Sequence, residues 1–309
     1  MRSFKKYPWL RPIIEARNWP VAQVVFIVMA AFRLIPAEKA VNISAIVARK
    51  LGPLLPRNQL GLDNLRLAFP EKSEEEYKDI LLQSWDNLGR TAAEYVYLDK
   101  IFDLQKDGID LSQFEFKNEK LFHELRTDGK PALIFAAHLA NWELLPICAA
   151  TFGLNVQSLF RIPNNRFIAK KLSDMRGGVM DGLVASGPGS AYQLSGSLQN
   201  GEHVGLLVDQ KFLRGIVVPF FGHPAYSNPL LAKLLRSCDC PVHGARTVRL
   251  PNGRFRMEIT EEISIPRDDN GEVDIQATTA KIAGIVENWI REYPGQWLWF
   301  HKRWEGSRR

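Results

Sequence analysis

The sequence predicts an α/β fold: a largely parallel central sheet flanked by helices, with a helical N-terminal region that associates with a membrane. Three observations lead to this prediction. After Gly129, short apolar runs alternate with amphipathic segments, a pattern typical of βαβ units. From about Val41 to Leu121 the spacing of apolar residues is helical. The first 40 residues join a basic segment to an almost uninterrupted apolar run.

The N-terminal segment combines charge with apolar surface. Five basic side chains against Glu15 give residues 1–20 a charge of +4, and the apolar run VAQVVFIVMAAF (21–32) follows. That run is shorter than the roughly 20 residues of a membrane span, and Arg33–Pro36 does not resemble a signal-peptide cleavage site. A buried core helix also fits the pattern. We expect residues 1–40 to lie on an anionic membrane at its cytoplasmic face, and residues 41–309 to form a single α/β domain.

The composition limits the classes of binding partner but does not identify one. The formal charge of +6 and the pI near 9.2 suit an acidic partner, which could be nucleic acid, an anionic membrane or an acidic carrier protein. Nucleic acid is disfavoured because the basic residues are scattered and no recognised motif is present. Cys238 and Cys240 are too close for a normal disulfide and lack the second half of a zinc site, so we expect no metal.

The helical region has clear boundaries. Residues 40–55 and 73–98 read as helices, separated near Pro70, and Ser73 with Glu76 forms a capping-box pattern. After Gly129 the expected elements follow in order. Strands are expected at 131–138, 155–161, 182–186, 203–209 and 296–304, helices at 139–152, 164–175, 191–200, 230–237 and 274–294, and a hairpin around Asn252-Gly253.

The chemistry is expected where the first of these strands ends. Ligands gather at the carboxyl ends of strands in open α/β sheets, and His138 lies at such an end. A histidine there is suited to act as a general base, and Glu143 is a candidate to accept the other ring N–H and orient the imidazole. The alternative is that His138 caps a helix and Glu143 is a solvated first-turn acid.

Sequence motifs add a family resemblance. HLANWELLP (138–146) resembles the H-x4-D/E motif of glycerolipid-type acyltransferases, with Ala140 where many relatives have glycine. Within that superfamily the chain is similar to the bacterial lipid A biosynthesis lauroyl/myristoyl acyltransferases. The similarity covers most of residues 40–305, and its further motifs are, in order, NLRLAFPEKSEEE, SWDNLGRTAAEY, LFRIPNN, LQNGEHVGLLVDQ with VVPFFG, and YPGQWLWFHKRW.

The resemblance implies an inner-membrane enzyme of Gram-negative bacteria that needs no cofactor. Such an enzyme moves a fatty acyl chain from acyl carrier protein to a hydroxyl on a hydroxyacyl chain of a Kdo-bearing lipid A precursor. His138 would be the general base and Glu143 its partner. Both substrates are anionic, which favours cationic side chains near the site. The substrate-binding candidates lie at or after strand ends: Arg161, Asn165, Arg176, Asp209 and Gln210.

Several alternatives remain open at the level of sequence. Asp209 and Gln210 fit a supporting structural role as well as substrate binding, and the basic helix carrying Asn165 and Arg176 also fits a solvated face. The acceptor could be another lipid, such as a lysophospholipid, glycolipid or ornithine lipid, and a non-catalytic membrane scaffold is a further reading. No acyl-enzyme is expected, because Cys148 reads as core and no Gly-x-Ser-x-Gly elbow is present.

Overall fold

The computed structural model describes residues 11–98, 113–177 and 182–304, and it confirms the α/β fold. A seven-stranded sheet has the order β1-β9-β8-β2-β5-β3-β4. Its neighbouring strands are parallel except for the antiparallel pair β8–β9. The strands are β1 (Phe114–Lys117), β2 (Leu133–Ala136), β3 (Val156–Phe160), β4 (Leu183–Ala185), β5 (His203–Leu207), β8 (Val242–Arg249) and β9 (Phe255–Ile259).

Helices cover both faces of the sheet, and alternate side chains of each strand point to opposite faces. On β2, Leu133 and Phe135 join the main core, whereas Ile134 joins a second cluster on the other face. The main core is shared with α10 (Ser190–Gln199), α11 (Leu230–Ser237) and α12 (Ile275–Glu292). The second face lies under α7 (Glu119–Thr127) and α8 (Leu144–Thr151). The catalytic candidates lie at the strand ends between these two layers.

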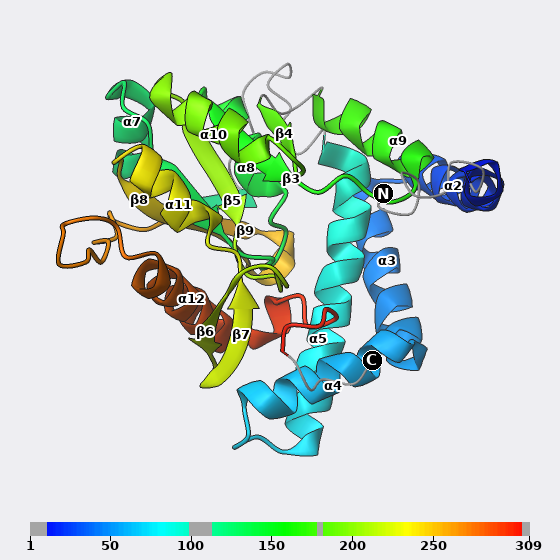
Figure 1. The fold of residues 1–309 in the computed structure, drawn as a ribbon. Coiled ribbons are helices and arrows are strands. Elements are labelled where there is room, and N and C mark those ends of the chain that lie inside the picture. Colours follow the sequence, from blue (N-terminus) through cyan, green and yellow to red (C-terminus); the bar gives the residue numbers. More distant parts are fainter. Residues whose placement is uncertain (1–10, 99–112, 178–181, 305–309) are drawn as a thin grey trace.

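The N-terminal helices stand beside the sheet (Figure 1). They are α2 (Arg11–Arg33), α3 (Ala37–Leu51), α4 (Pro56–Ala68) and α5 (Glu74–Glu94), with the short 3-10 helices η2 (Gly52–Leu54) and η3 (Tyr95–Tyr97). Helix α9 (Arg166–Gly177) packs against α2. No helix within the described ranges has both the length and the apolar character needed to cross a membrane.

Local sequence signals explain several boundaries. The predicted capping box opens α5: Ser73 Oγ accepts from the Glu76 N–H at 3.3 Å, and the Glu76 carboxylate accepts from the Ser73 N–H at 2.8 Å. The predicted hairpin is also confirmed. Its turn contains the 3-10 helix η5 (Pro251–Gly253), in which Asn252 and Gly253 have φ of 61° and 74°, a conformation these residue types tolerate.

Apart from the C-terminal segment, three local details differ from the expectations. Strand β1 interrupts the region expected to be helical throughout, where Phe-Glu-Phe-Lys alternates with the period of a strand. Helix α8 begins at Leu144 rather than at residue 139. An antiparallel hairpin of β6 (Ile216–Phe220) and β7 (His223–Ser227), which was not predicted, forms a separate small sheet.

The expected strand at 296–304 is wrong. After the 3-10 helix η6 (Pro294–Gln296), this segment makes a single bridge, between Trp297 and Leu139, and otherwise runs irregularly. Several of its backbone carbonyls accept hydrogen bonds from side chains of other elements instead. Asn64 on α4, for example, donates to the carbonyl oxygens of Trp299 and His301 at 2.8 Å each. These side-chain bonds replace the ladder that a strand would have formed.

Candidate active site

His138 follows β2 and is held by a buried carboxylate. Its ring Nδ1 lies 2.7 Å from Asp209 Oδ1, and its backbone N–H donates to Asp209 Oδ2 at 2.9 Å. The Asp209 side chain is completely buried, whereas 13% of the His138 side chain is exposed. Asp209 follows β5, the parallel neighbour of β2, so both residues reach the same edge of the sheet. The pairing fixes both the position and the rotation of the imidazole ring.

The protonation of this pair follows from its surroundings. Burial alone would raise the pKa of Asp209, but the nearby His138 charge and the hydrogen bonds from His138 lower it well below its ordinary value. Trp297 Nε1 donates a further bond to Asp209 Oδ2 at 2.8 Å. Because the ionised carboxylate can only accept, Nδ1 carries a proton, and in the neutral tautomer of the ring the lone pair is on Nε2. The Gln210 amide nitrogen lies 3.2 Å from Nε2.

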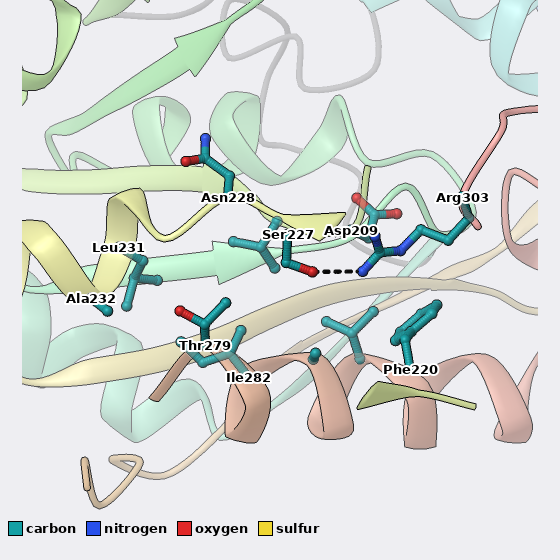
Figure 2. Close-up of a pocket in the computed structure, with 12 residues that line it drawn as sticks. Asp209, Phe220, Ser227, Asn228, Leu231, Ala232, Thr279, Ile282 and Arg303 are labelled. Carbon is teal, nitrogen blue, oxygen red and sulfur yellow. Dashed lines mark hydrogen bonds between the residues drawn. The ribbon is translucent and has the colours of Figure 1, made fainter. Parts of the chain in front are cut away.

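A buried cation lies on the inner side of Asp209 (Figure 2). Arg303 and Asp209 line the same small cavity, and Arg303 donates to the Tyr226 carbonyl and to Ser227 Oγ at 2.8 Å each. Its guanidinium also lies 4.6 Å from the ring centre of Phe220. Burial lowers the Arg303 pKa to about 10, so the side chain stays charged at neutral pH. Its charge helps to keep Asp209 ionised inside the protein.

The loop that carries His138, here called the site loop (residues 137–143), explains the late start of α8. Ala140 has a φ of 46°, a left-handed conformation that no α-helix contains. Its N–H donates to the Gln296 carbonyl at 2.9 Å. Asn141 Oδ1 then accepts from the Glu143 N–H at 3.2 Å, and Glu143 is the N-cap residue of α8. A glycine at this position would adopt the φ of Ala140 without strain.

The two acidic residues considered from the sequence have different surroundings. The contact at His138 Nδ1 that we expected from Glu143 belongs to Asp209, because the end of β5 lies directly beside the end of β2. Glu143 lies on the wall of the cavity that begins at His138. Its part in the chemistry stays a prediction. The buried carboxylate of Asp209 fits support of His138 rather than direct contact with substrate.

A cavity of about 870 Å³ extends from His138 between the sheet and the α7–α8 layer. Its wall is mainly apolar. On the strands, the wall includes alternate residues such as Ile134 and Ala136 on β2. Helix α8 contributes side chains spaced by three or four residues, namely Leu145, Cys148, Ala149 and Phe152. The end near His138 is polar and also contains Glu143, Arg161, Gln210 and Lys211.

The cavity runs along the direction of the strands, from the strand ends near His138 toward their opposite ends. β1 runs antiparallel to β2, because β1 is parallel to β9, β9 is antiparallel to β8, and β8 is parallel to β2. The C-terminal end of β1 and the C-terminal end of β2, which His138 follows, therefore lie at opposite ends of the sheet along the strand direction. Lys117 and Asn118, at that end, line the cavity together with His123 on α7. A strand of five residues is about 17 Å long, which gives the scale of the cavity along the strands.

The other substrate-binding candidates are placed as follows. Arg161 and Gln210 line the cavity near His138. Asn165 caps α9 through its Oδ1, which accepts from the Phe167 N–H at 3.0 Å, and its amide donates to the Asn18 carbonyl at 2.8 Å. These bonds give Asn165 a structural task in joining α9 to α2. Arg176 belongs to α9, but its side chain lies outside the described residues.

Other nucleophile and metal chemistry receives little support from the described residues. Burial raises the pKa of Cys148 to about 12, so its thiolate is scarce at neutral pH. Within the described residues, no group of His, Cys, Asp and Glu side chains is arranged to hold a metal ion. The hydrogen bond from Trp297 to Asp209 was not predicted from the sequence. A tryptophan in an apolar segment carries no sequence signal for a partner 88 residues away.

The chain is similar in sequence to known proteins over most of its length. The family model described as bacterial lipid A biosynthesis acyltransferase matches residues 14–306. A lipid A biosynthesis palmitoleoyltransferase of Escherichia coli K12 is 24% identical over 274 residues, covering 82% of this chain and 80% of that protein. A lipid A biosynthesis acyltransferase of Shigella flexneri matches with the same identity and coverage.

Proposed function

The chain belongs to the bacterial lipid A biosynthesis acyltransferase family, and we propose that it moves a fatty acyl chain from acyl carrier protein to a Kdo-bearing lipid A precursor. Acyl transfer in lipid A biosynthesis is the activity of this family. The acceptor group in our proposal is a hydroxyl on one of the precursor's hydroxyacyl chains. The observation that carries the proposal is an oriented histidine, His138, at the polar end of a long apolar cavity.

His138 acts as the general base. Its Nε2 lone pair accepts the proton of the acceptor hydroxyl while the hydroxyl oxygen attacks the thioester carbonyl carbon. The carbon–sulfur bond then breaks, and the proton passes from His138 to the departing thiolate, which leaves as a thiol. Asp209 holds Nδ1 and stabilises the imidazolium while it exists. We place the acceptor hydroxyl near the position of the Gln210 amide nitrogen, which lies 3.2 Å from Nε2.

Charged groups near His138 suit anionic substrates. Arg161 and Lys211 line the same end of the cavity. A phosphate or sugar carboxylate of the acceptor, or the developing oxyanion, would gain charge-assisted hydrogen bonds there. In this proposal Glu143, which lines the same end of the cavity, contacts the acceptor. Direct transfer without a covalent enzyme intermediate agrees with the raised pKa of Cys148.

The apolar part of the cavity is proposed to hold the donor acyl chain. Its volume of about 870 Å³ is in the range of typical ligand pockets, about 300–1,000 Å³. A fatty chain has no polar group to satisfy, so a wall of aliphatic and aromatic side chains is the environment that favours it. With the thioester at His138, the chain would extend along the strands toward the opposite sheet edge. The side chains at that end, including Phe122 and His123, would limit its length.

The N-terminal helices are proposed to lie on the cytoplasmic surface of the inner membrane. Large apolar side chains are exposed along α2, α3 and η2: Trp19, Val21, Val24, Ile27, Val28, Ile43, Ile46, Val47, Leu51 and Leu54. Single exposed apolar residues are common on monomeric proteins, but this many on consecutive helices favour a contact with an apolar medium. Exposed Arg17, Arg33, Lys39 and Lys50 on the same elements suit anionic headgroups.

The decisive test is acyl transfer from radiolabelled acyl carrier protein to a Kdo-bearing lipid A precursor. Lauroyl, myristoyl and palmitoleoyl donors are compared, with wild type, His138→Ala, Glu143→Ala and Asp209→Asn. We expect His138→Ala to lower the rate by about 10²–10⁴, the usual contribution of a general base. His223→Ala is a matched control, because His223 lies on β7 and its ring contacts the Leu67 carbonyl.

Each outcome is informative. Transfer that survives His138→Ala in a folded variant would overturn the base assignment. A full rate in Glu143→Ala with a loss in Asp209→Asn would remove Glu143 from the mechanism and leave Asp209 as the orienting carboxylate. No wild-type transfer with any donor would contradict the proposed acceptor, and lysophospholipid, glycolipid and ornithine-lipid acceptors would be tested next.

A further inference from the structure

Helix α5 presents a stripe of buried polar side chains toward the site loop. Ser84, Asn87, Thr91 and Glu94 are spaced by three, four and three residues, which places them on one helix face. All four are buried, with exposed fractions of 2–7%. A buried helix face is normally apolar, and each buried polar group needs a partner. The stripe therefore identifies a polar contact surface inside the protein.

Three of these four side chains form hydrogen bonds with the site loop, whereas Ser84 donates to the carbonyls of Gly295 and Trp297. Asn87 Nδ2 and Thr91 Oγ1 both donate to the Ala140 carbonyl, at 3.1 Å each. Glu94 Oε2 accepts from Asn141 Nδ2 at 2.9 Å. These bonds act on the residue with left-handed φ and on its neighbour, at the point where the chain turns between His138 and α8. They hold the loop in a conformation that a non-glycine residue disfavours.

A buried arginine from the sheet completes the network. Arg249, at the end of β8, makes two bonds to the Glu94 carboxylate, at 2.5 Å and 2.9 Å. Its Nε donates to Asn87 Oδ1 at 3.0 Å. The side chain of Gln296 accepts from the Arg249 N–H and donates to the Arg249 carbonyl, at 2.8 Å and 2.9 Å. The loop is thus tied to α5, to the sheet and to η6.

We propose that Glu94, Arg249 and Asn141 are positioning residues that set the conformation of the site loop and, through it, the place of His138. This inference rests on the proposed function, in which His138 is the base. A buried ion pair contributes little to stability relative to apolar side chains of the same size. The ion pair has a geometric role here. The bidentate pair with Arg249 fixes the Glu94 carboxylate, and this carboxylate then holds Asn141 at one distance and orientation.

The network constrains the loop from the side opposite Asp209. Asp209 contacts the His138 ring and N–H, whereas the α5 stripe contacts Ala140 and Asn141. Both supports are needed to place Nε2 at the end of the cavity. A displacement of about 1 Å at a reacting group can lower a rate by about 100-fold. Loss of the network should therefore appear in kcat more than in the KM for either substrate.

The test exchanges the hydrogen-bonding roles of Glu94 and Asn141. In Glu94→Gln the introduced amide weakens the pair with Arg249, and in Asn141→Asp the introduced carboxylate faces the Glu94 carboxylate. We expect each single variant to lower kcat by 10- to 100-fold, with KM for both substrates within about threefold. The double variant restores the hydrogen bond between residues 94 and 141 and the original charge, but only one of the two bonds to Arg249, so we expect it to recover part of the activity lost in the poorer single variant.

A variant of the same helix controls for general loss of stability. The Tyr77 hydroxyl donates to the Phe69 carbonyl at 2.7 Å, and Tyr77 is buried and distant in sequence from the stripe. Tyr77→Phe should lower the melting temperature and leave kcat within twofold. The proposal is overturned if Glu94→Gln leaves kcat unchanged, or if the double variant is as impaired as the product of the single losses.

A readout independent of activity separates this proposal from the proposed function. Amide hydrogen exchange of residues 138–144 should be faster in Glu94→Gln and Asn141→Asp than in wild type or Tyr77→Phe. Faster exchange in an enzyme that fails to acylate the precursor would retain the network as the support of the loop and reject only the acceptor. Unchanged exchange in both variants would overturn the positioning role, whatever the activity.

Discussion

Two apolar segments near the ends of the described chain have opposite surroundings. The C-terminal segment (residues 297–304) and the apolar run of α2 (residues 21–32) are both rich in large apolar side chains. At the C-terminal end, Trp297, Trp299 and Trp304 have exposed fractions of at most 1%. On α2, Val24 and Ile27 are 62% and 67% exposed. Composition alone therefore does not decide whether an apolar segment is core or surface.

The difference lies in the polar atoms of each segment. Every indole N–H of the C-terminal segment finds an acceptor within the protein: Asp209 for Trp297, the Pro294 carbonyl for Trp299 and the Phe220 carbonyl for Trp304. Such specific partners exist only in one folded arrangement. The exposed aliphatic side chains of α2 need no partner, so that surface can face any apolar medium. A buried segment needs matching partners, and a membrane-facing one needs only apolar area.

The strongest test of this comparison removes one tryptophan from each end. Trp299→Ala deletes a fully buried side chain that packs against Phe69, Phe221 and Trp297, and we expect it to cost about 3–5 kcal/mol of unfolding free energy. Trp19→Ala removes a half-exposed side chain and should change stability by less than about 0.5 kcal/mol. Urea denaturation followed by circular dichroism measures both. Equal losses would contradict the division into core and surface.

The second prediction concerns the surface itself. Ile27→Ser removes an exposed apolar side chain from α2, and if that side chain enters the membrane the change costs about 2 kcal/mol, or about 30-fold in partitioning. Flotation with phosphatidylethanolamine–phosphatidylglycerol vesicles measures the partitioning. Tyr192→Ser is the matched control, because Tyr192 is 86% exposed but lies on α10, away from α2 (Figure 1). If both variants bind vesicles as wild type does, α2 does not contact the membrane.

The smallest expected effect lies where the C-terminal segment meets the site loop. Ala140 donates its N–H to Gln296 and has a φ of 46°, so Ala140→Gly should relieve left-handed strain and stabilise the protein by about 1 kcal/mol. The gain is reduced by the greater chain entropy of glycine in the unfolded state. The midpoint of urea unfolding measures it, with Ala30→Gly within α2 as a control expected to destabilise. A lower midpoint for Ala140→Gly would show that no strain is stored at this position.

Much of the fold could be predicted because its signals are local. The alternation of strands and helices after Gly129, the capping box at Ser73 and the turn at Asn252 each depend on residues within a few positions of one another. The C-terminal segment was assigned to a strand because apolar residues in a short run resemble one. Its true conformation depends on acceptors supplied by distant elements, such as Asn64.

The candidate site divides in the same way. The end of β2 at His138 followed from the sequence, because an apolar run that stops at a polar residue marks the end of a buried strand. The sequence also showed the motif spacing between His138 and Glu143. It contained no sign that α5 supplies the polar stripe, because Asn87, Thr91 and Glu94 look like ordinary surface residues of an amphipathic helix.

By itself, the sequence determined the α/β class, the order of most elements, the place of His138 and the family to which the chain belongs. Only the tertiary structure decided that Asp209, 71 residues along the chain, holds Nδ1, and that Arg249 closes the network behind the site loop. It also decided which apolar end is buried. The physical reason is that periodicity and capping act over a few residues, whereas the partner of a buried polar atom is chosen by which strand ends and helix faces the fold brings together.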